Sequence, residues 1–161
     1  MSGDILYNLS MKYDFLGKRN RCAIFGTINE YEKELQKNRT SQFYEQIIID
    51  YNCGEFWFSS EDSFEQYSYD VLCGLKQKFP YIKLVWVGTE DNNTRNYDEF
   101  KLVDYQGNMF ISPYKLLVMQ IVKECAIVAV NIFIANKQNA SIAYEYATCL
   151  NRKLLNYLYF C

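Results

Sequence analysis

The stretch Ala126-Ile-Val-Ala-Val-Asn-Ile-Phe-Ile134 is an almost unbroken run of apolar side chains, rich in valine and isoleucine. Such a run is typical of a strand inside a parallel sheet, where helices cover both faces. Along the rest of the chain, short apolar runs alternate with longer segments of helical periodicity, which predicts βαβ units. We therefore expect an α/β protein, a single Rossmann-like three-layer domain with a five-stranded, mainly parallel sheet.

Four further strands are expected, with the run described above at the centre of the sheet. They cover residues 21–25, 55–58, 83–88 and 153–158. The polar residues 89–108 predict one long loop between the third and fourth strands. Residues 1–20 lie outside the alternation, ahead of a domain at residues 21–161. Their apolar side chains predict an accessory helix, or an arm that joins subunits into a homo-oligomer.

Periodicity and start signals predict four helices. Residues 30–51 place apolar side chains on one face, and residues 141–150 turn Glu145 away from the core. Ser63, with Gln66 three residues later, forms a capping box for another helix. The last start signal is a capping serine followed by proline, which suits the first helical position. It lies at Ser112-Pro113.

The overall charge argues against two classes of partner. The chain has 17 basic and 19 acidic residues, for a formal net charge of −2. It therefore presents no broad basic field to a nucleic-acid backbone or an anionic membrane. The sequence also shows no secretory leader pattern and no apolar stretch near the ~20 residues that span a bilayer. We expect a cytoplasmic protein that binds neither nucleic acid nor membrane.

The cysteines and the absence of histidine limit the disulfides, metal sites and general bases that the chain could contain. Five of the six cysteines lie in or beside apolar runs, and no C-x-x-C pair occurs, which predicts free buried thiols. They are Cys22, Cys53, Cys73, Cys125 and Cys149. Because the chain contains no histidine, the commonest metal ligand and the commonest general base are both absent. We expect no metal site and no cofactor.

Several stretches, in this order along the chain, resemble one family. They are Cys22-Ala-Ile-Phe-Gly26, Phe56-Trp-Phe-Ser-Ser60 with Phe64-Glu65, Leu75-Lys-Gln-Lys-Phe-Pro-Tyr-Ile-Lys-Leu84, Ala140-Ser-Ile-Ala-Tyr-Glu-Tyr-Ala147 and Lys153-Leu-Leu-Asn156. They resemble the SLOG superfamily, a Rossmann-like group that includes the DprA and LOG proteins. The chain looks closest to a small bacterial branch with a G-H-R turn after the first strand. The resemblance covers roughly residues 21–158 and implies ligand loops at the carboxyl ends of the strands.

The chain departs from that family at its turns. The G-H-R turn reads Gly26-Thr27-Ile28, the family's glycine after the second strand is Ser59, and the S-G-T turn reads Asn139-Ala140-Ser141. The P-G-G-x-G-T-x-x-E stretch of LOG phosphoribohydrolases is absent. Glycines in such turns let backbone N–H groups close around phosphate. Their replacement weakens the prediction of phosphate binding without excluding it.

Candidate ligand-binding residues follow the expected strands. They are Gly26, Thr27, Ser59, Ser60, Asn139 and Ser141. The residues at 139–141 open a helix and could receive an anion there, although asparagine and serine also serve as ordinary N-caps. Tyr97, Tyr105 and Tyr114 lie near the long loop and could stack on a base or supply an interface.

Two adjacent carboxylates are weak catalytic candidates. Glu61 and Asp62 could contact ribose hydroxyls, or serve as acid and base in glycosidic cleavage. Acidic residues just ahead of a helix also simply stabilise its dipole. The leading hypothesis is a binding protein for a nucleotide-like small ligand. The alternatives are an enzyme that cleaves an N-glycosidic or phosphoester bond, and an interaction module that has lost its pocket.

Overall fold

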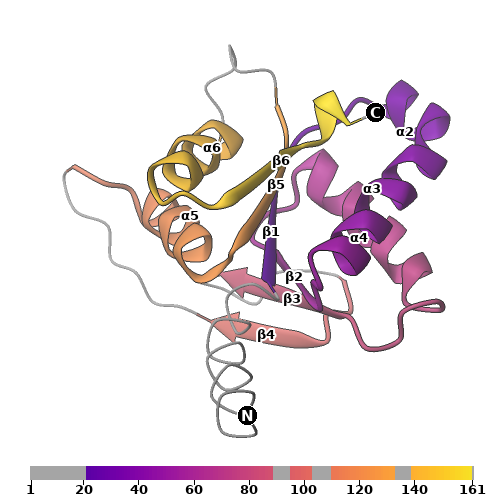
Figure 1. Ribbon diagram of the computed structural model, residues 1–161. Coiled ribbons are helices and arrows are strands. Elements are labelled where there is room, and N and C mark those ends of the chain that lie inside the picture. The colour runs from indigo at the N-terminus through magenta and orange to yellow at the C-terminus, as the bar shows by residue number, and fades with distance from the viewer. Residues whose placement is uncertain (1–20, 89–94, 103–109, 133–138, 161) are drawn as a thin grey trace, which may run out of the picture.

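Figure 1 shows a computed structural model of the chain, which describes residues 21–88, 95–102, 110–132 and 139–160. One sheet lies between α5 and α6 on one face and α3 and α4 on the other (Figure 1). Its strand order is β4-β3-β2-β1-β5-β6, and every neighbouring pair is parallel. The predicted α/β, Rossmann-like architecture is confirmed, but the sheet has six strands instead of five.

The bounds of three of the five expected strands agree to within one residue, whereas the last expected strand, residues 153–158, ends at Asn156 and is followed by a 3-10 turn. The strands are β1 Arg21–Gly26, β2 Glu55–Phe58, β3 Lys83–Gly88, β4 Glu99–Leu102, β5 Ile127–Asn131 and β6 Lys153–Asn156. The helices are α2 Glu30–Leu35, α3 Lys37–Asp50, α4 Ser63–Leu75, α5 Pro113–Glu124 and α6 Asn139–Cys149, with a final 3-10 turn, η1, at Tyr157–Tyr159. β5 leaves the ladder after Asn131, earlier than expected, and residues 133–134 lie outside the described part.

The additional strand is β4, at the edge of the sheet, where one long loop was expected. Asp98 brings the chain back to the start of β3. Its backbone N–H donates to the Leu84 carbonyl at 2.8 Å, and its side-chain Oδ2 accepts from the Leu84 N–H at 2.7 Å. β4 then pairs with β3 from Val85↔Glu99 onward. The expected central strand, β5, has neighbours on both sides, but β1 and β2 hold the middle of the order.

Two helix predictions need correction. The helix expected over residues 30–51 is two helices that meet at Gln36, whose φ of −116° and ψ of 15° are not helical. The capping box at Ser63 is wrong, because the N-cap of α4 is Asp62 and the Ser63 hydroxyl accepts from the Ile28 N–H at 2.8 Å. The capping serine before α5 is confirmed, since Ser112 Oγ accepts from the backbone N–H three residues on.

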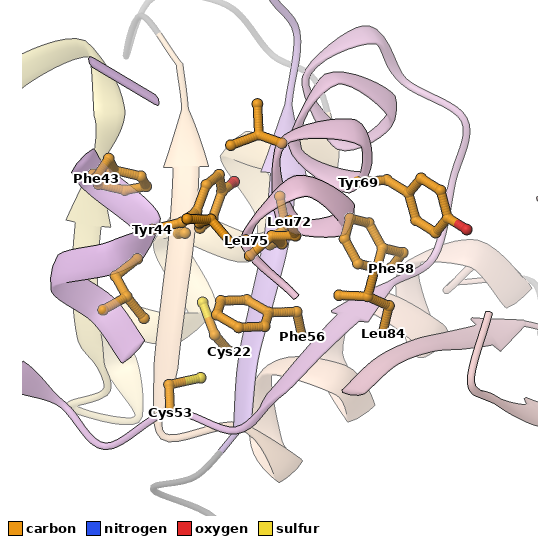
Figure 2. Close-up of a cluster of buried hydrophobic side chains, with 14 of the residues drawn as sticks. Cys22, Phe43, Tyr44, Cys53, Phe56, Phe58, Tyr69, Leu72, Leu75 and Leu84 are labelled. Carbon is orange, nitrogen blue, oxygen red and sulfur yellow. The ribbon is translucent and has the colours of Figure 1, made fainter. Parts of the chain in front are cut away.

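The two faces of the sheet bury different kinds of side chain. Towards α3 and α4 the core is aromatic, and Figure 2 shows Phe43, Tyr44 and Phe56 within it. Towards α5 and α6 it is small and aliphatic, with Val128 and Val130 fully buried, as the apolar run predicts. Both tryptophans are in the core.

Some of the cysteine thiols are buried and others are exposed. Cys22, Cys53 and Cys125 are buried, whereas Cys73 and Cys149 are exposed, so the prediction of buried thiols fails for two. All five are free, and Cys161 lies outside the described residues. No helix in the described part of the chain is both long and apolar enough to cross a membrane.

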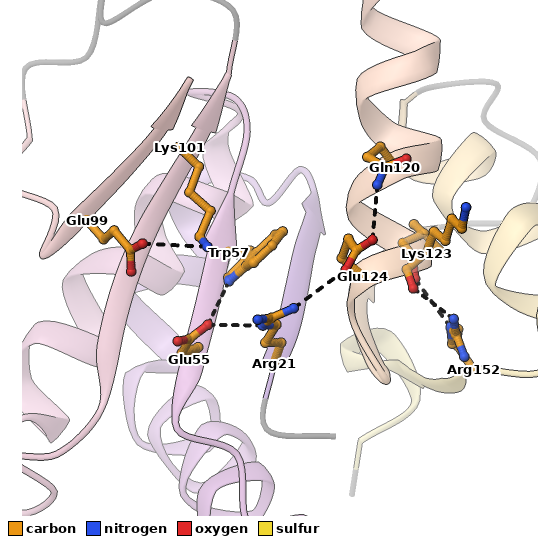
Figure 3. A network of polar contacts seen from close by, with 10 residues as sticks. Arg21, Glu55, Trp57, Glu99, Lys101, Gln120, Lys123, Glu124 and Arg152 are labelled. Atoms are coloured by element: carbon orange, nitrogen blue, oxygen red, sulfur yellow. Dashed lines mark hydrogen bonds and ion pairs between the residues drawn. The ribbon is translucent and has the colours of Figure 1, made fainter. Parts of the chain in front are cut away.

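A polar network ties elements together at the amino ends of the strands. Arg21, the first residue of β1, lies 3.3 Å from a Glu55 carboxylate oxygen on β2 and 3.6 Å from one of Glu124 on α5 (Figure 3). Its guanidinium also lies over the ring of Trp57. These ion pairs are at the opposite end of the sheet from the predicted ligand-binding residues, so they hold the scaffold.

Candidate functional site

The carboxyl ends of all six parallel strands lie along one edge of the sheet. The strand order reverses direction between β1 and β5, and open α/β sheets bind ligands in the crevice at such a switch point. Gly26 and Thr27 end or follow β1, and Ser59 and Ser60 follow β2. The predicted residues of the first two strands are therefore brought to one edge.

The start of α6 belongs to the same edge. The helix ends beside the amino end of β6, where the Lys153 N–H donates to the Ala126 carbonyl, so its first turn lies at the carboxyl end. Asn139 is the first residue of α6 and Ser141 lies within its first turn, half-buried. Both stand inside the helix and not ahead of it, which corrects the expected turn. Glu145 is exposed, as predicted.

Gly26 is required by the close approach of two strands. Its φ is +141°, and a Cβ atom there would lie 2.6 Å from the Asn131 carbonyl oxygen of β5. The Asn131 side chain donates from Nδ2 to the Thr27 carbonyl at 2.9 Å. The Ile28 N–H donates to the Ser63 hydroxyl. Two backbone groups of the turn after β1, the Thr27 carbonyl and the Ile28 N–H, are therefore hydrogen-bonded within the protein. Gly26 sets the strand spacing, a role that phosphate recognition does not explain.

The turn after β2 is closed by a side chain that was not among the predicted site residues. Glu65 Oε1 accepts from the backbone N–H groups of Ser59 at 3.0 Å and Ser60 at 3.2 Å. Its Oε2 is hydrogen-bonded to the Ser60 hydroxyl. Only 1% of Glu65 is exposed. The backbone donors expected to meet a ligand therefore already have a partner inside the protein.

The Glu65 carboxyl is held close to its neutral form. Burial raises its pKa from 4.5 to about 8, and the charge of Asp62 acts in the same direction. The hydrogen bonds from Ser60 and Ser59 oppose that shift without overcoming it. At neutral pH the group retains its proton for most of the time.

Two hydroxyl groups at this turn lie close to each other but make no well-formed hydrogen bond to any described residue. They are Ser59 Oγ and Tyr114 Oη, and both atoms are buried. Burial, and then the Glu65 carboxyl, raise the pKa of Tyr114 to about 12, while weak hydrogen bonding by the Ser59 and Ser60 hydroxyls acts in the opposite direction. Tyr114 comes from the first turn of α5, so it reaches this place from a different element. We call Ser59, Ser60, Glu65 and Tyr114 the β2 corner.

Buried hydroxyls without partners are costly, by about 1–3 kcal/mol each, and native structures contain few of them. Ser59 is only 6% exposed, so solvent does not readily satisfy it. A ligand group that both donates and accepts hydrogen bonds would satisfy the two hydroxyls together. The corner is therefore suited to polar recognition.

The remaining predicted residues lie around the corner or in the core. Glu61 is exposed and its backbone carbonyl accepts from Gln66, while Asp62 is half-buried at the start of α4. Tyr97 is buried between Trp86 and other aromatic rings, so it belongs to the core. Tyr105 and residues 1–20 lie outside the described part. Among the described residues, no group of three or more acidic or cysteine side chains is placed to hold a metal ion.

One signal in the sequence could have identified Glu65. Glu65, Ser68 and Leu72 are spaced three and four residues apart, so they share one side of α4. All three are buried. A glutamate on a helix stripe that also carries leucine faces the interior, where a carboxyl group needs donors. The donors come from the end of β2, which helical spacing alone does not reveal.

A separate groove lies between α3 and the segment from β6 to Phe160. Its volume is about 340 Å³. It is lined by Phe43, Gln46, Ile47, Tyr51, Leu154, Leu155, Asn156, Tyr159 and Phe160. None of the predicted site residues lines it.

Comparison with known proteins adds no family to these observations. No protein-family model matches the chain, and no curated protein matches its sequence. The resemblance to the SLOG superfamily stays a prediction.

Proposed function

We propose that the chain binds a nucleotide-derived small ligand at the carboxyl-terminal edge of its sheet. The observation that carries this proposal is the pair of buried, unpartnered hydroxyls of Ser59 and Tyr114 beside a topological switch point. Ligand sites commonly combine a mostly apolar lining with a few converging polar groups. The β2 corner supplies such groups from two elements, β2 and α5.

Two observations favour binding over bond cleavage. The best-placed carboxyl, Glu65, already accepts hydrogen bonds from two amides and one hydroxyl, so both of its oxygens are engaged within the protein. The phenol of Tyr114 is a weak acid, with its pKa raised to about 12, so it donates a hydrogen bond more readily than it gives up a proton. Both groups suit recognition.

The test is thermal unfolding with a panel of ribonucleosides, mononucleotides, cyclic nucleotides and dinucleotides. A ligand at about 100 times its dissociation constant stabilises the native state by roughly 2.7 kcal/mol. For a chain of this size, that corresponds to a rise in Tm of about 5–10 °C. Ser59→Ala and Tyr114→Phe should each remove most of the rise.

Matched controls are Ser41→Ala and Tyr81→Phe, which make the same chemical changes on α3 and at the amino end of β3. They should leave the ligand-induced rise unchanged. If no ligand of the panel changes Tm at millimolar concentration, these ligands do not bind and the proposal is wrong for them.

A further inference from the structure

The β2 corner resembles an anion-binding site that is occupied by a side chain of the protein, Glu65. Two consecutive backbone N–H groups at the start of a helix are a common cradle for phosphate. Here the N–H groups of Ser59 and Ser60 both point to Glu65 Oε1, at 3.0 and 3.2 Å. Because the carboxyl comes from the first turn of α4 itself, it fills the cradle permanently.

The charges around the corner also act against an incoming anion. The charged neighbour that raises the pKa of Glu65 is the carboxylate of Asp62, and the groups that raise the pKa of Tyr114 electrostatically are Glu65 and Asp62. A phosphate at this place would meet the Asp62 carboxylate and would compete for the donors that Glu65 already uses. Its desolvation would go uncompensated.

What the corner leaves available is neutral. Ser59 Oγ and Tyr114 Oη can each donate one hydrogen bond and accept others, and Tyr114 on α5 lies beside the Ser59 hydroxyl that follows β2. A vicinal diol offers the same mixture of donors and acceptors with no charge. The sugar of a nucleoside is the part of a nucleotide-derived ligand that fits this description.

We infer that the β2 corner binds the sugar hydroxyls of the ligand and not its phosphate, and that Glu65 determines this specificity by filling the anion cradle from within. This inference rests on the proposed function, since it assigns one part of that ligand to one part of the site. Any phosphate of the ligand then lies outside the corner.

The first experiment compares ligands on the wild-type protein by calorimetric titration. Ribonucleosides should bind at least about tenfold more tightly than their 2′,3′-dideoxy analogues, because the analogues leave Ser59 and Tyr114 unpaired. Ser59→Ala should reduce that ratio to near one. Inorganic phosphate alone should neither bind in the corner nor raise Tm.

The second experiment needs no nucleoside. Glu65→Ala frees the two N–H groups, so formate, acetate or phosphate at millimolar concentration should raise its Tm. The same anions should leave the wild type and Glu65→Gln unchanged, because in both the cradle stays filled. If Glu65→Ala does not fold alone, refolding in the presence of formate is the readout, and recovery of the native fold supports the inference.

The outcomes separate the two proposals. If neither a ribonucleoside nor any nucleotide of the thermal panel binds the wild type, the proposed function and the sugar assignment are both wrong. If ribonucleosides bind but the dideoxy analogues bind equally well, the proposed function stands and the inference is overturned. An absence of any anion response in Glu65→Ala, folded or refolding, overturns the role of Glu65.

Discussion

Gly26 and Asn131 end neighbouring strands so close together that a Cβ atom on Gly26 would lie 2.6 Å from the Asn131 carbonyl oxygen and 2.8 Å from its nitrogen. This contact is between two backbones, which cannot rotate away as a side chain can. The approach occurs at the switch point, between β1 and β5, and it brings the turn after β1 against the end of β5. The geometry of the crevice thus depends on residue 26 having no side chain.

Gly26→Ala should therefore lower the free energy of unfolding by about 2 kcal/mol or more, because it adds both the collision and an unfavourable φ. Urea denaturation of both proteins measures the loss. Gly74→Ala is the matched control, since a Cβ there meets nothing within 4 Å near the end of α4. It should be neutral or stabilising, by up to about 1 kcal/mol. Equal effects at both positions would contradict the close approach.

The buried carboxyl predicts a distinctive pH dependence. The folded state holds the Glu65 proton up to a pKa of about 8, while the unfolded chain releases it near 4.5. The free energy of unfolding should therefore fall as pH rises between these values, with a contribution approaching roughly 1.4 kcal/mol per pH unit, and level off above.

Glu65→Gln has no proton to lose, so its stability should change less across this window. Urea denaturation at intervals from about pH 5 to about pH 9 compares the two slopes. The two proteins differ at residue 65 alone. Parallel curves for the two proteins would mean that Glu65 is already ionised in the folded state at low pH.

Arg39 holds the end of the described chain against α3. Its guanidinium donates to the carbonyls of Phe160, from Nε at 3.0 Å, and Tyr157, at 3.1 Å, and lies 4.6 Å from the centre of the Tyr157 ring. Arg39→Ala should lower the free energy of unfolding by about 1–3 kcal/mol, because two partly buried carbonyls lose a charged donor. Lys37→Ala removes an exposed charge from the same helix and should cost under about 0.5 kcal/mol.

Hydrogen exchange gives a local readout of the same change. In Arg39→Ala, exchange should accelerate at residues 157–160 more than in the sheet, because η1 loses its anchor. Unchanged exchange there, with uniform loss elsewhere, would show that Arg39 supports the whole fold and not this segment.

The thiols offer a test of the helix faces. Cys73 and Cys149 are exposed, so both should be alkylated in the native protein, with Cys73 slower, because burial raises the pKa of its thiol. Cys22, Cys53 and Cys125 should react only after unfolding. Peptide mapping after a short iodoacetamide pulse separates the groups. Native labelling of Cys22 as rapid as that of Cys149 would contradict the arrangement of β1 inside the sheet.

Local patterns were enough to predict most of the scaffold. The apolar run at residues 126–134 indicated a buried parallel strand, and Ser112-Pro113 predicted the start of α5, because each signal depends on near neighbours in the chain. β4 was missed because Glu99–Leu102 alternates for only four residues inside a polar segment. What makes it a strand is the return of Asp98 to Leu84, a contact between segments that the sequence does not mark.

The candidate site divides in the same way. The sequence by itself determined that Gly26, Ser59 and Ser60 would lie at the ends of parallel strands, because strand ends can be read from where apolar runs stop. Only the tertiary structure decided what those residues contact. Glu65 meets the amides after β2 because α4 folds back on that strand, and Tyr114 reaches the same corner from α5. Burial by distant elements, which no local pattern records, raises the pKa of that carboxyl and encloses the hydroxyls of Ser59 and Tyr114.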